Sequence, residues 1–190
     1  MKKVARILVA GVGTGKEMID CLQNNPHWAI TGFDPAEPML SIARKKVAAA
    51  SLEKNISLVH GLINDVEEED FDAATSILVM HFLPDDGTKF NFLKGISDRL
   101  KPSALMILVD LEGEIGSAEY STLNAAWKNQ QIFKRGQTDT VEEEFLRREK
   151  EVHFIPQERI EPLLEDAGFI NIHKFFKAYL FGGYVAEKKE

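Results

Sequence analysis

The sequence has little that would suit an oxidising compartment, a membrane or a nucleic-acid surface. Cys21 is the only cysteine, so the chain can form no internal disulfide bond and no cysteine zinc cluster. No apolar run approaches the roughly 18 residues that span a bilayer, and glycines follow the apolar N-terminal stretch where a signal cleavage site would lie. The net charge of −7 gives no general attraction to nucleic acid. We therefore expect a cytoplasmic protein with neither a membrane nor DNA as a partner.

Apolar runs alternate with helical patterns along the 190 residues, which is typical of a parallel α/β sheet. No internal repeat or linker is visible, so we expect a single domain over residues 1–190. The predicted fold is a doubly wound, mostly parallel seven-stranded sheet. Its first five strands are expected at Ala5–Ala10, Trp28–Phe33, Ile56–Val59, Ala73–Met80 and Leu105–Asp110, with helices at Lys16–Gln23, Pro38–Ala50 and Lys89–Leu100.

The regular alternation stops after the fifth strand. The segment from about 112 to 155 is polar and shows no obvious strand, so we predict a mostly helical insert. A helix over Pro156–Ala167 follows and ends at a glycine. Two apolar runs, Ile170–Leu180 and Tyr184–Ala186, flank Gly182-Gly183, and this pattern predicts a C-terminal antiparallel hairpin with the glycines at its turn.

The stretch ILVAGVGTGKE, residues 7–17, resembles two nucleotide-binding loops but matches neither. A phosphate-binding P-loop would need a glycine at Ala10 and a hydroxyl at Glu17, where a carboxylate would repel a triphosphate. A dinucleotide loop would need its third glycine one residue later than Gly15, which disfavours an NAD-dependent oxidoreductase. Glycines here still allow close approach of the backbone to a ligand.

Two further segments follow strands and reach the same carboxyl edge of the sheet, where open α/β sheets bind ligands. Asp34 ends the second strand and lies 21 residues after Gly13, a spacing that suits an acid bonding a ribose diol. Pro35, Pro38 and Met39 offer apolar surface to a base, and GLIND, residues 61–65, follows the third strand. The pattern predicts a nucleoside site without evidence of a phosphate.

The ordered set AGVGTG, GFDPAEPML, FDAATSILVMHFLPD, RLKPSALMILVD and LLEDAGF resembles the class I S-adenosylmethionine-dependent methyltransferases along essentially the whole chain. The resemblance implies S-adenosylmethionine as cofactor and S-adenosylhomocysteine as product. It implies Asp34 as the ribose-binding acid and Met39 as an adenine neighbour. The full set of cofactor-binding residues that it implies is Gly11, Gly13, Gly15, Asp34, Pro35, Met39, Leu62, Ile63 and Ile77.

Two positions depart from the family pattern. Members usually carry an acid two residues before the first loop glycine, where this chain has Val9, and an acid after the third strand, where it has Leu62. At the second position only the Ile63 amide and Asp65 remain to bind the adenine. Both departures predict weaker cofactor binding, and they leave open a binding module of the same fold that has lost turnover.

The layout FKRGQTDTVEEEFLRREKEV with the ending FFKAYLFGGYVAEKK is similar to tRNA uridine methyltransferases that use carboxy-S-adenosylmethionine. This resemblance implies that Arg148, next to Arg147, pairs with the extra carboxylate of that cofactor or with a carboxylate of the substrate. The alternative is a solvated basic helix face that balances Glu142 to Glu144.

The catalytic candidates follow the fourth and fifth strands. His81 can act as a base or contact the substrate, and Asp110 and Glu112 can face it. No cluster has metal-ligand spacing, so no metal is expected. The acceptor is expected to be a small molecule or an RNA base. Apolar residues of the insert at helical spacing also predict a homodimer or a substrate cleft: Leu123, Trp127, Ile132 and Phe133.

Overall fold

The computed structural model describes residues 4–190, which form seven strands and six α-helices. The strands are β1 (Arg6–Ala10), β2 (Ala29–Asp34), β3 (Ile56–His60), β4 (Phe71–Ile77), β5 (Leu100–Leu111), β6 (Phe169–Ala178) and β7 (Phe181–Lys188). The helices are α1 (Lys16–Asn24), α2 (Glu37–Ala49), α3 (Thr88–Asp98), α4 (Ala118–Arg135), α5 (Thr138–Glu151) and α6 (Gln157–Asp166), with short 3-10 helices η1 (Ile63–Asp65) and η2 (Met80–Phe82).

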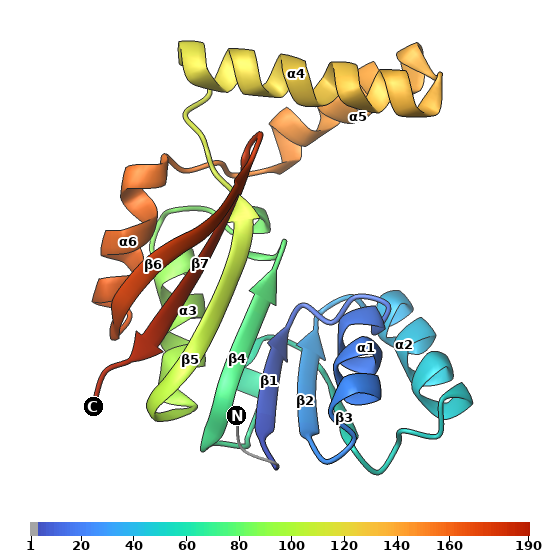
Figure 1. Ribbon diagram of the computed structural model, residues 1–190, viewed down its shortest axis with the longest axis vertical. Helices are drawn as coiled ribbons and strands as arrows, with labels where there is room; N and C mark the ends of the chain where they lie inside the picture. Colours follow the sequence, from blue (N-terminus) through green and yellow to red (C-terminus); the bar gives the residue numbers. More distant parts are fainter. Residues whose placement is uncertain (1–3) are drawn as a thin grey trace.

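All seven strands form one sheet in the order β3-β2-β1-β4-β5-β7-β6. Strands β1 to β5 are parallel to their neighbours, and β7 runs antiparallel between β5 and β6. Helices α1 and α2 lie on one face of the sheet, and α3 and α6 lie on the other (Figure 1). The predicted fold, a doubly wound α/β sheet finished by an antiparallel hairpin, is therefore confirmed.

Strand β1 is buried on both faces, which explains its unbroken apolar sequence. Leu8 and Ala10 belong to the core that contains residues of α3 and α6, whereas Ile7 and Val9 belong to the core beneath α1 and α2. Successive side chains of a strand point to opposite faces, so one short segment supports both layers. This packing fixes the carboxyl end of β1, from which the glycine loop departs.

The face that carries α1 is covered only in part. Within residues 4–190 no helix lies over β4 and β5 on that face (Figure 1), and the side chains of Leu105 and Ile107 there are 50% and 38% exposed. A cavity of about 520 Å³ lies on this surface between the strands and α1. None of the described helices is long and apolar enough to cross a membrane.

Helices α4 and α5 form an antiparallel pair above the carboxyl end of the sheet, and we call this pair the helical cover (Figure 1). It has its own apolar cluster, in which Trp127 and Phe145 join Leu180 from the turn between β6 and β7. Of the insert residues with predicted apolar contacts, Leu123 and Ile132 also pack here, but Phe133 is 90% exposed. Most of that stripe therefore packs within the protein, and the homodimer remains a prediction.

The predicted hairpin turn at Gly182-Gly183 is wrong. The turn lies at Tyr179-Leu180, and both glycines are inside β7. A Cβ atom at Gly182 would lie 2.2 Å from a carboxylate oxygen of Glu112, and one at Gly183 would lie 3.0 Å from Phe176. The glycines are thus required by close packing across strands and not by a turn.

The ends of two strands also differ from the prediction. Strand β4 ends at Ile77 and not at Met80, because Leu78 adopts a positive φ of 59° and the chain turns into η2. Strand β5 begins at Leu100, before Pro102, with an irregular register against β4. Apolar composition alone predicted neither boundary.

Candidate functional site

The glycine loop joins β1 to α1 and is attached to the end of β2. The amides of Gly11 and Val12 both donate to the carbonyl oxygen of Phe33, at 2.9 and 3.1 Å. Gly11, Gly13 and Gly15 all have positive φ, at 68°, 52° and 80°. This conformation is unfavourable for other residues, which explains the alternating glycines.

The three loop glycines differ in what surrounds them. A Cβ atom at Gly11 would lie 2.3 Å from a methyl of Val79, and one at Gly15 would lie 3.1 Å from Ala43. At Gly13, no atom lies within 4 Å of the Cβ position. Two glycines therefore allow close packing of the protein, whereas Gly13 leaves open space beside the loop that a ligand can occupy.

Asp34, at the end of β2, holds this loop in place. Its carboxylate accepts hydrogen bonds from the amides of Gly13 and Ala36, both at 2.8 Å, and the residue is only 8% exposed. A carboxylate has about four lone-pair sites, so each oxygen can accept a further bond. The geometry fits an acid that receives the two hydroxyls of a ribose beside the open space at Gly13.

The remaining predicted cofactor residues lie near the strand ends with mainly exposed side chains. Pro35, Met39, Leu62 and Ile77 are exposed, as expected for apolar surface available to a ligand. Ile63 is buried, so it can offer a ligand only its backbone. The Asp65 carboxylate accepts a hydrogen bond of 2.7 Å from the Leu62 amide, which occupies part of its capacity to bind adenine.

Val9 is buried and apolar, but a carboxylate lies close to it in space. Val9 is in register with Thr75 of β4, and the Thr75 hydroxyl donates a 2.6 Å hydrogen bond to Glu17 of α1. Glu17 also lines a cavity with Gly11 and Ile77. The sequence indicated only that Glu17 excludes a P-loop. The bond between Glu17 and Thr75 depends on β4 lying beside β1, which the local sequence does not encode.

Replacing Glu17 with glutamine is expected to stabilise the fold in a pH-dependent way. Burial raises the pKa of Glu17, so its contribution to stability is present below its unfolded pKa and is lost as the pH rises through the folded pKa. Glutamine keeps an acceptor for Thr75 without the charge. We expect Glu17→Gln to raise the free energy of unfolding by on the order of 1 kcal/mol at about pH 8 and by much less near pH 4, measured by urea denaturation.

The control is Asp20→Asn, which removes an exposed acid from the same helix, where Asp20 pairs only with Lys16. It should give no comparable gain at high pH. A gain from Glu17→Gln of equal size at both pH values would contradict the assignment of the effect to a buried charge.

His81 and Asp110 form a buried pair at the carboxyl ends of β4 and β5. Nδ1 of His81 lies 2.5 Å from a carboxylate oxygen of Asp110, and the two residues are 6% and 3% exposed. Asp110 also accepts hydrogen bonds from the backbone amides of His81 and Leu111. The carboxylate therefore favours the tautomer with the proton on Nδ1, which leaves a lone pair on Nε2.

No hydrogen bond from residues 4–190 occupies Nε2 of His81. The ring centroid lies 4.2 Å from that of the exposed Phe82, with the two rings tilted by 46°. The carbonyl of His81 accepts a 2.8 Å hydrogen bond from the amide of His153, just beyond α5. The two catalytic candidates are thus brought together from positions 29 residues apart, as an oriented base with its carboxylate partner.

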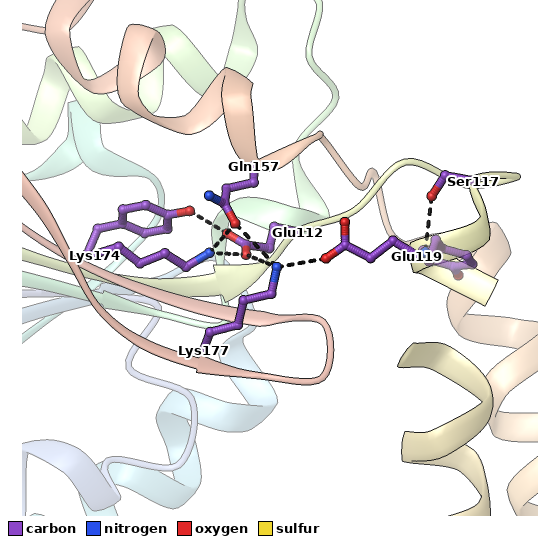
Figure 2. Close-up of polar contacts among 8 residues, drawn as sticks. Glu112, Ser117, Glu119, Gln157, Lys174 and Lys177 are labelled. Carbon is purple, nitrogen blue, oxygen red and sulfur yellow. Dashed lines mark hydrogen bonds and ion pairs between the residues drawn. The ribbon is translucent and has the colours of Figure 1, made fainter. Parts of the chain in front are cut away.

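Glu112, the third acidic candidate, belongs to a different network (Figure 2). Its carboxylate is 3% exposed, accepts a 2.5 Å hydrogen bond from the Tyr184 hydroxyl and pairs with Lys174. Lys177 lies 3.6 Å from Glu112 and 3.0 Å from Glu119 of α4. These bonds join the hairpin to the base of the helical cover. Burial and the adjacent Glu112 raise the pKa of Tyr184, so its hydroxyl remains a donor.

Arg148 does not lie on a solvated basic face. Its guanidinium lies 4.0 Å from the ring centroid of Trp127 and 4.2 Å from that of Phe145, inside the helical cover. Arg147, by contrast, is exposed and lies near Glu151 at 3.7 Å. Among the described residues no group of three or more His, Cys, Asp or Glu side chains is arranged to hold a metal ion.

The sequence matches the family model of a methyltransferase domain over residues 7–103, from β1 into β5, which is just over half of the chain. The chain therefore belongs to this family, the class I S-adenosylmethionine-dependent methyltransferases. A comparison with curated proteins gave no match.

Solved structures of methyltransferases share the fold. An O-methyltransferase family protein from Burkholderia thailandensis has a TM-score of 0.71 and 11% identity, covering 98% of this chain and 51% of its own. An O-methyltransferase family 2 protein from Planctomyces limnophilus has a TM-score of 0.69 and 16% identity, covering 97% and 50%. For a methyltransferase from Methanosarcina mazei the values are 0.70 and 16%, covering 100% and 94%. At these identities the similarity establishes the fold, and the chain spans about half the length of the first two of these structures.

Proposed function

We propose that the protein transfers a methyl group from S-adenosylmethionine to an oxygen or nitrogen that must lose a proton, on a small molecule or an RNA base. The observation that carries this proposal is the buried His81–Asp110 pair, with a 2.5 Å contact that directs a free Nε2 lone pair away from the carboxylate. A base of this kind is useful only for an acceptor whose O–H or N–H must be deprotonated.

The residues around the glycine loop fit the cofactor. The space beside Gly13 is open, and the Asp34 carboxylate beside it keeps capacity to bond a ribose diol. When bound, S-adenosylmethionine supplies a methyl group to the acceptor atom and leaves as neutral S-adenosylhomocysteine. Nε2 of His81 takes the acceptor's proton, and Asp110 stabilises the positive charge that develops on the imidazole ring. The proposal needs no metal.

Calorimetry with S-adenosylmethionine and S-adenosylhomocysteine tests the cofactor site. Asp34→Ala should lower the affinity by about 10- to 100-fold, because it removes charge-assisted hydrogen bonds worth roughly 1.5–3 kcal/mol. The variant also releases the Gly13 amide, so Asp34→Asn, which keeps an acceptor, should lose less. Binding by Asp34→Ala as tight as that of the parent would show that the ligand lies elsewhere.

The alternative is a protein of the same fold that binds the cofactor without turnover. The apolar side chains of Val9 and Leu62, at positions where the family usually has acids, favour it. The two proposals differ in one measurement: both predict binding of S-adenosylhomocysteine, but only the enzyme transfers radioactive methyl to a panel of phenols, heterocycles and RNA. A cytoplasmic location and a homodimer are compatible with both functions, and we keep both as proposals.

Use of carboxy-S-adenosylmethionine on a tRNA uridine is the other alternative, and it requires Arg148 to contact the cofactor. The cavity that Arg148 lines includes no residue of the glycine loop, which favours a contact with the acceptor instead. A selective loss of affinity for the carboxylated cofactor in Arg148→Met, with unchanged affinity for the ordinary one, would support the carboxylated cofactor.

A further inference from the structure

Arg148 is a half-buried cation without an acceptor. No hydrogen bond or ion pair joins it to the described residues, and its Nη1 atom is enclosed by protein without a partner. Each of the other arginines has a carboxylate or a backbone carbonyl: Arg6, Arg44, Arg99, Arg135, Arg147 and Arg159. Folded proteins rarely leave such donors unsatisfied, because the lost hydration is costly.

The protein has a carboxylate nearby but uses it elsewhere. Glu144 lies one helical turn before Arg148, and both of its oxygens accept hydrogen bonds from Arg135, at 2.7 and 2.9 Å. Burial accordingly lowers the pKa of Arg148, with Glu144 only partly offsetting the effect. The aromatic faces of Trp127 and Phe145 hold the guanidinium in place but accept none of its hydrogen bonds in the plane of the group.

The guanidinium lines a cavity of about 410 Å³ between the helical cover and the turn of the β6–β7 hairpin. Its walls combine flat rings with amides, from Trp127, Phe145, Tyr179, Phe181, Gln130 and Gln131. Trp127 packs edge-on against both Phe145 and Phe181, at 4.9 and 4.7 Å, so these walls are fixed. Arg135 and Glu144 also line the cavity, but they are paired with each other, so Arg148 is its one unpaired charge. A cavity of this size, with four aromatic residues and one unpaired cation, suits a small flat anion.

We propose that this cavity binds an aromatic carboxylic acid whose carboxylate pairs with Arg148. The planar guanidinium fork matches two carboxylate oxygens, and the surrounding rings accommodate an aromatic ring. Nη1 is enclosed by protein, so the carboxylate would pair with Nε and Nη2, the two guanidinium nitrogens that are neither enclosed nor bonded within the described residues. No second cation in the cavity is free for a larger anion, because Arg135 is already paired with Glu144.

This acid is the methyl acceptor, an inference that rests on the proposed function. The carbonyl of Arg148 accepts the amide of Val152, and the amide of the next residue, His153, donates to His81. Four helical residues rise about 6 Å, so the turn that carries Arg148 lies close to the segment that contacts the base. His81 does not line the cavity, so the acceptor that fits is an aromatic hydroxy acid that extends out of the cavity, with its carboxylate at Arg148 and its hydroxyl toward His81.

Tryptophan fluorescence tests the binding without cofactor or turnover. The chain has only two tryptophans, so Trp28→Phe leaves Trp127 in the cavity wall as the reporter. Benzoate should change its emission saturably. Benzamide, which has the same shape without the charge, should bind at least about 10-fold more weakly, since it forms no charge-assisted pair.

Two arginine variants in this background locate the charge. Arg148→Met keeps an apolar stem between the rings and should weaken benzoate binding by at least about 10-fold. Arg147→Met, the adjacent exposed arginine, should change it by less than about two-fold. Arg148→Lys keeps the charge but lacks the planar fork, and it should fall between the two. Circular dichroism confirms the fold of each variant, and Arg148→Lys still tests the pair if Arg148→Met does not fold.

Several results would overturn the proposal: no saturable response of Trp127 to benzoate, equal affinity for benzoate and benzamide, or equal effects of Arg147→Met and Arg148→Met. Tighter binding of phenyl phosphate than of benzoate would overturn the assignment to a carboxylate. S-adenosylhomocysteine affinity, measured by calorimetry, should be the same in all these variants. If the parent protein did not bind S-adenosylhomocysteine, the proposed function would be refuted. The benzoate experiment would still decide whether the cavity binds an aromatic carboxylate.

Discussion

Replacing His81 with glutamine is expected to lower kcat for methyl transfer by about 100- to 10,000-fold, the usual contribution of a positioned general base. Glutamine can still contact Asp110, but it cannot take a proton from the acceptor. The affinity for S-adenosylhomocysteine should not change, because the glycine loop and Asp34 lie on other strands. The measurement is single-turnover transfer of radioactive methyl, with calorimetry on the same preparation.

The matched control is His153→Gln. His153 is an exposed histidine that contacts His81 only through its backbone amide, so its side chain should not affect the rate. Asp110→Asn should slow transfer with little effect on KM for the cofactor, since asparagine does not fix the same tautomer. A His81→Gln variant as fast as the parent would leave the His81–Asp110 pair with a purely structural role.

Gly13→Val is expected to lower the affinity for S-adenosylmethionine by more than about 100-fold. The valine side chain would fill the open space beside the loop, where no protein atom lies within 4 Å of the Cβ position. The φ of 52° also strains a β-branched residue, at a cost of roughly 1–3 kcal/mol in stability. Calorimetry measures the affinity, and thermal unfolding measures the strain.

Gly136→Val separates these two effects. Gly136 ends α4 with a φ of 63° and also has no atom within 4 Å of its Cβ position, but it lies far along the chain from the loop. It should lose similar stability and keep cofactor affinity. Equal affinities in the parent and in Gly13→Val would show that the space beside Gly13 does not hold the ligand.

The sheet was predictable from sequence because its central strands are apolar without interruption and its helices lie regularly between them. The errors occur where backbone geometry overrides composition. Leu78 has the apolar character of a strand residue but a positive φ that ends β4. Gly182 and Gly183 have the composition of a turn, yet they are strand residues that make room for Glu112 and Phe176.

The candidate site was predictable only where its residues are local in sequence. The spacing between Gly13 and Asp34 predicted a ribose-binding acid, which stays a prediction, and the structure places the Asp34 carboxylate 2.8 Å from the Gly13 amide. The pairing of His81 with Asp110 depends on β4 and β5 being neighbours in parallel register, which no local pattern encodes. The isolation of Arg148 was also hidden, because it follows from Arg135 occupying the acid that would otherwise have paired with it.

The strand order also determines when the chain can fold during synthesis. β1 leaves the ribosome first but lies in the middle of the sheet, and its partner β4 begins only at Phe71. β4 gains most of its pairing with β5 only from Leu105 onward. The other edge of β5 stays unpaired until β7 has been synthesised. A nascent chain that ends at residue 103 contains the whole segment that matches the family model, but it still exposes an unpaired edge of β4. Unpaired strand edges of this kind promote aggregation of incomplete chains.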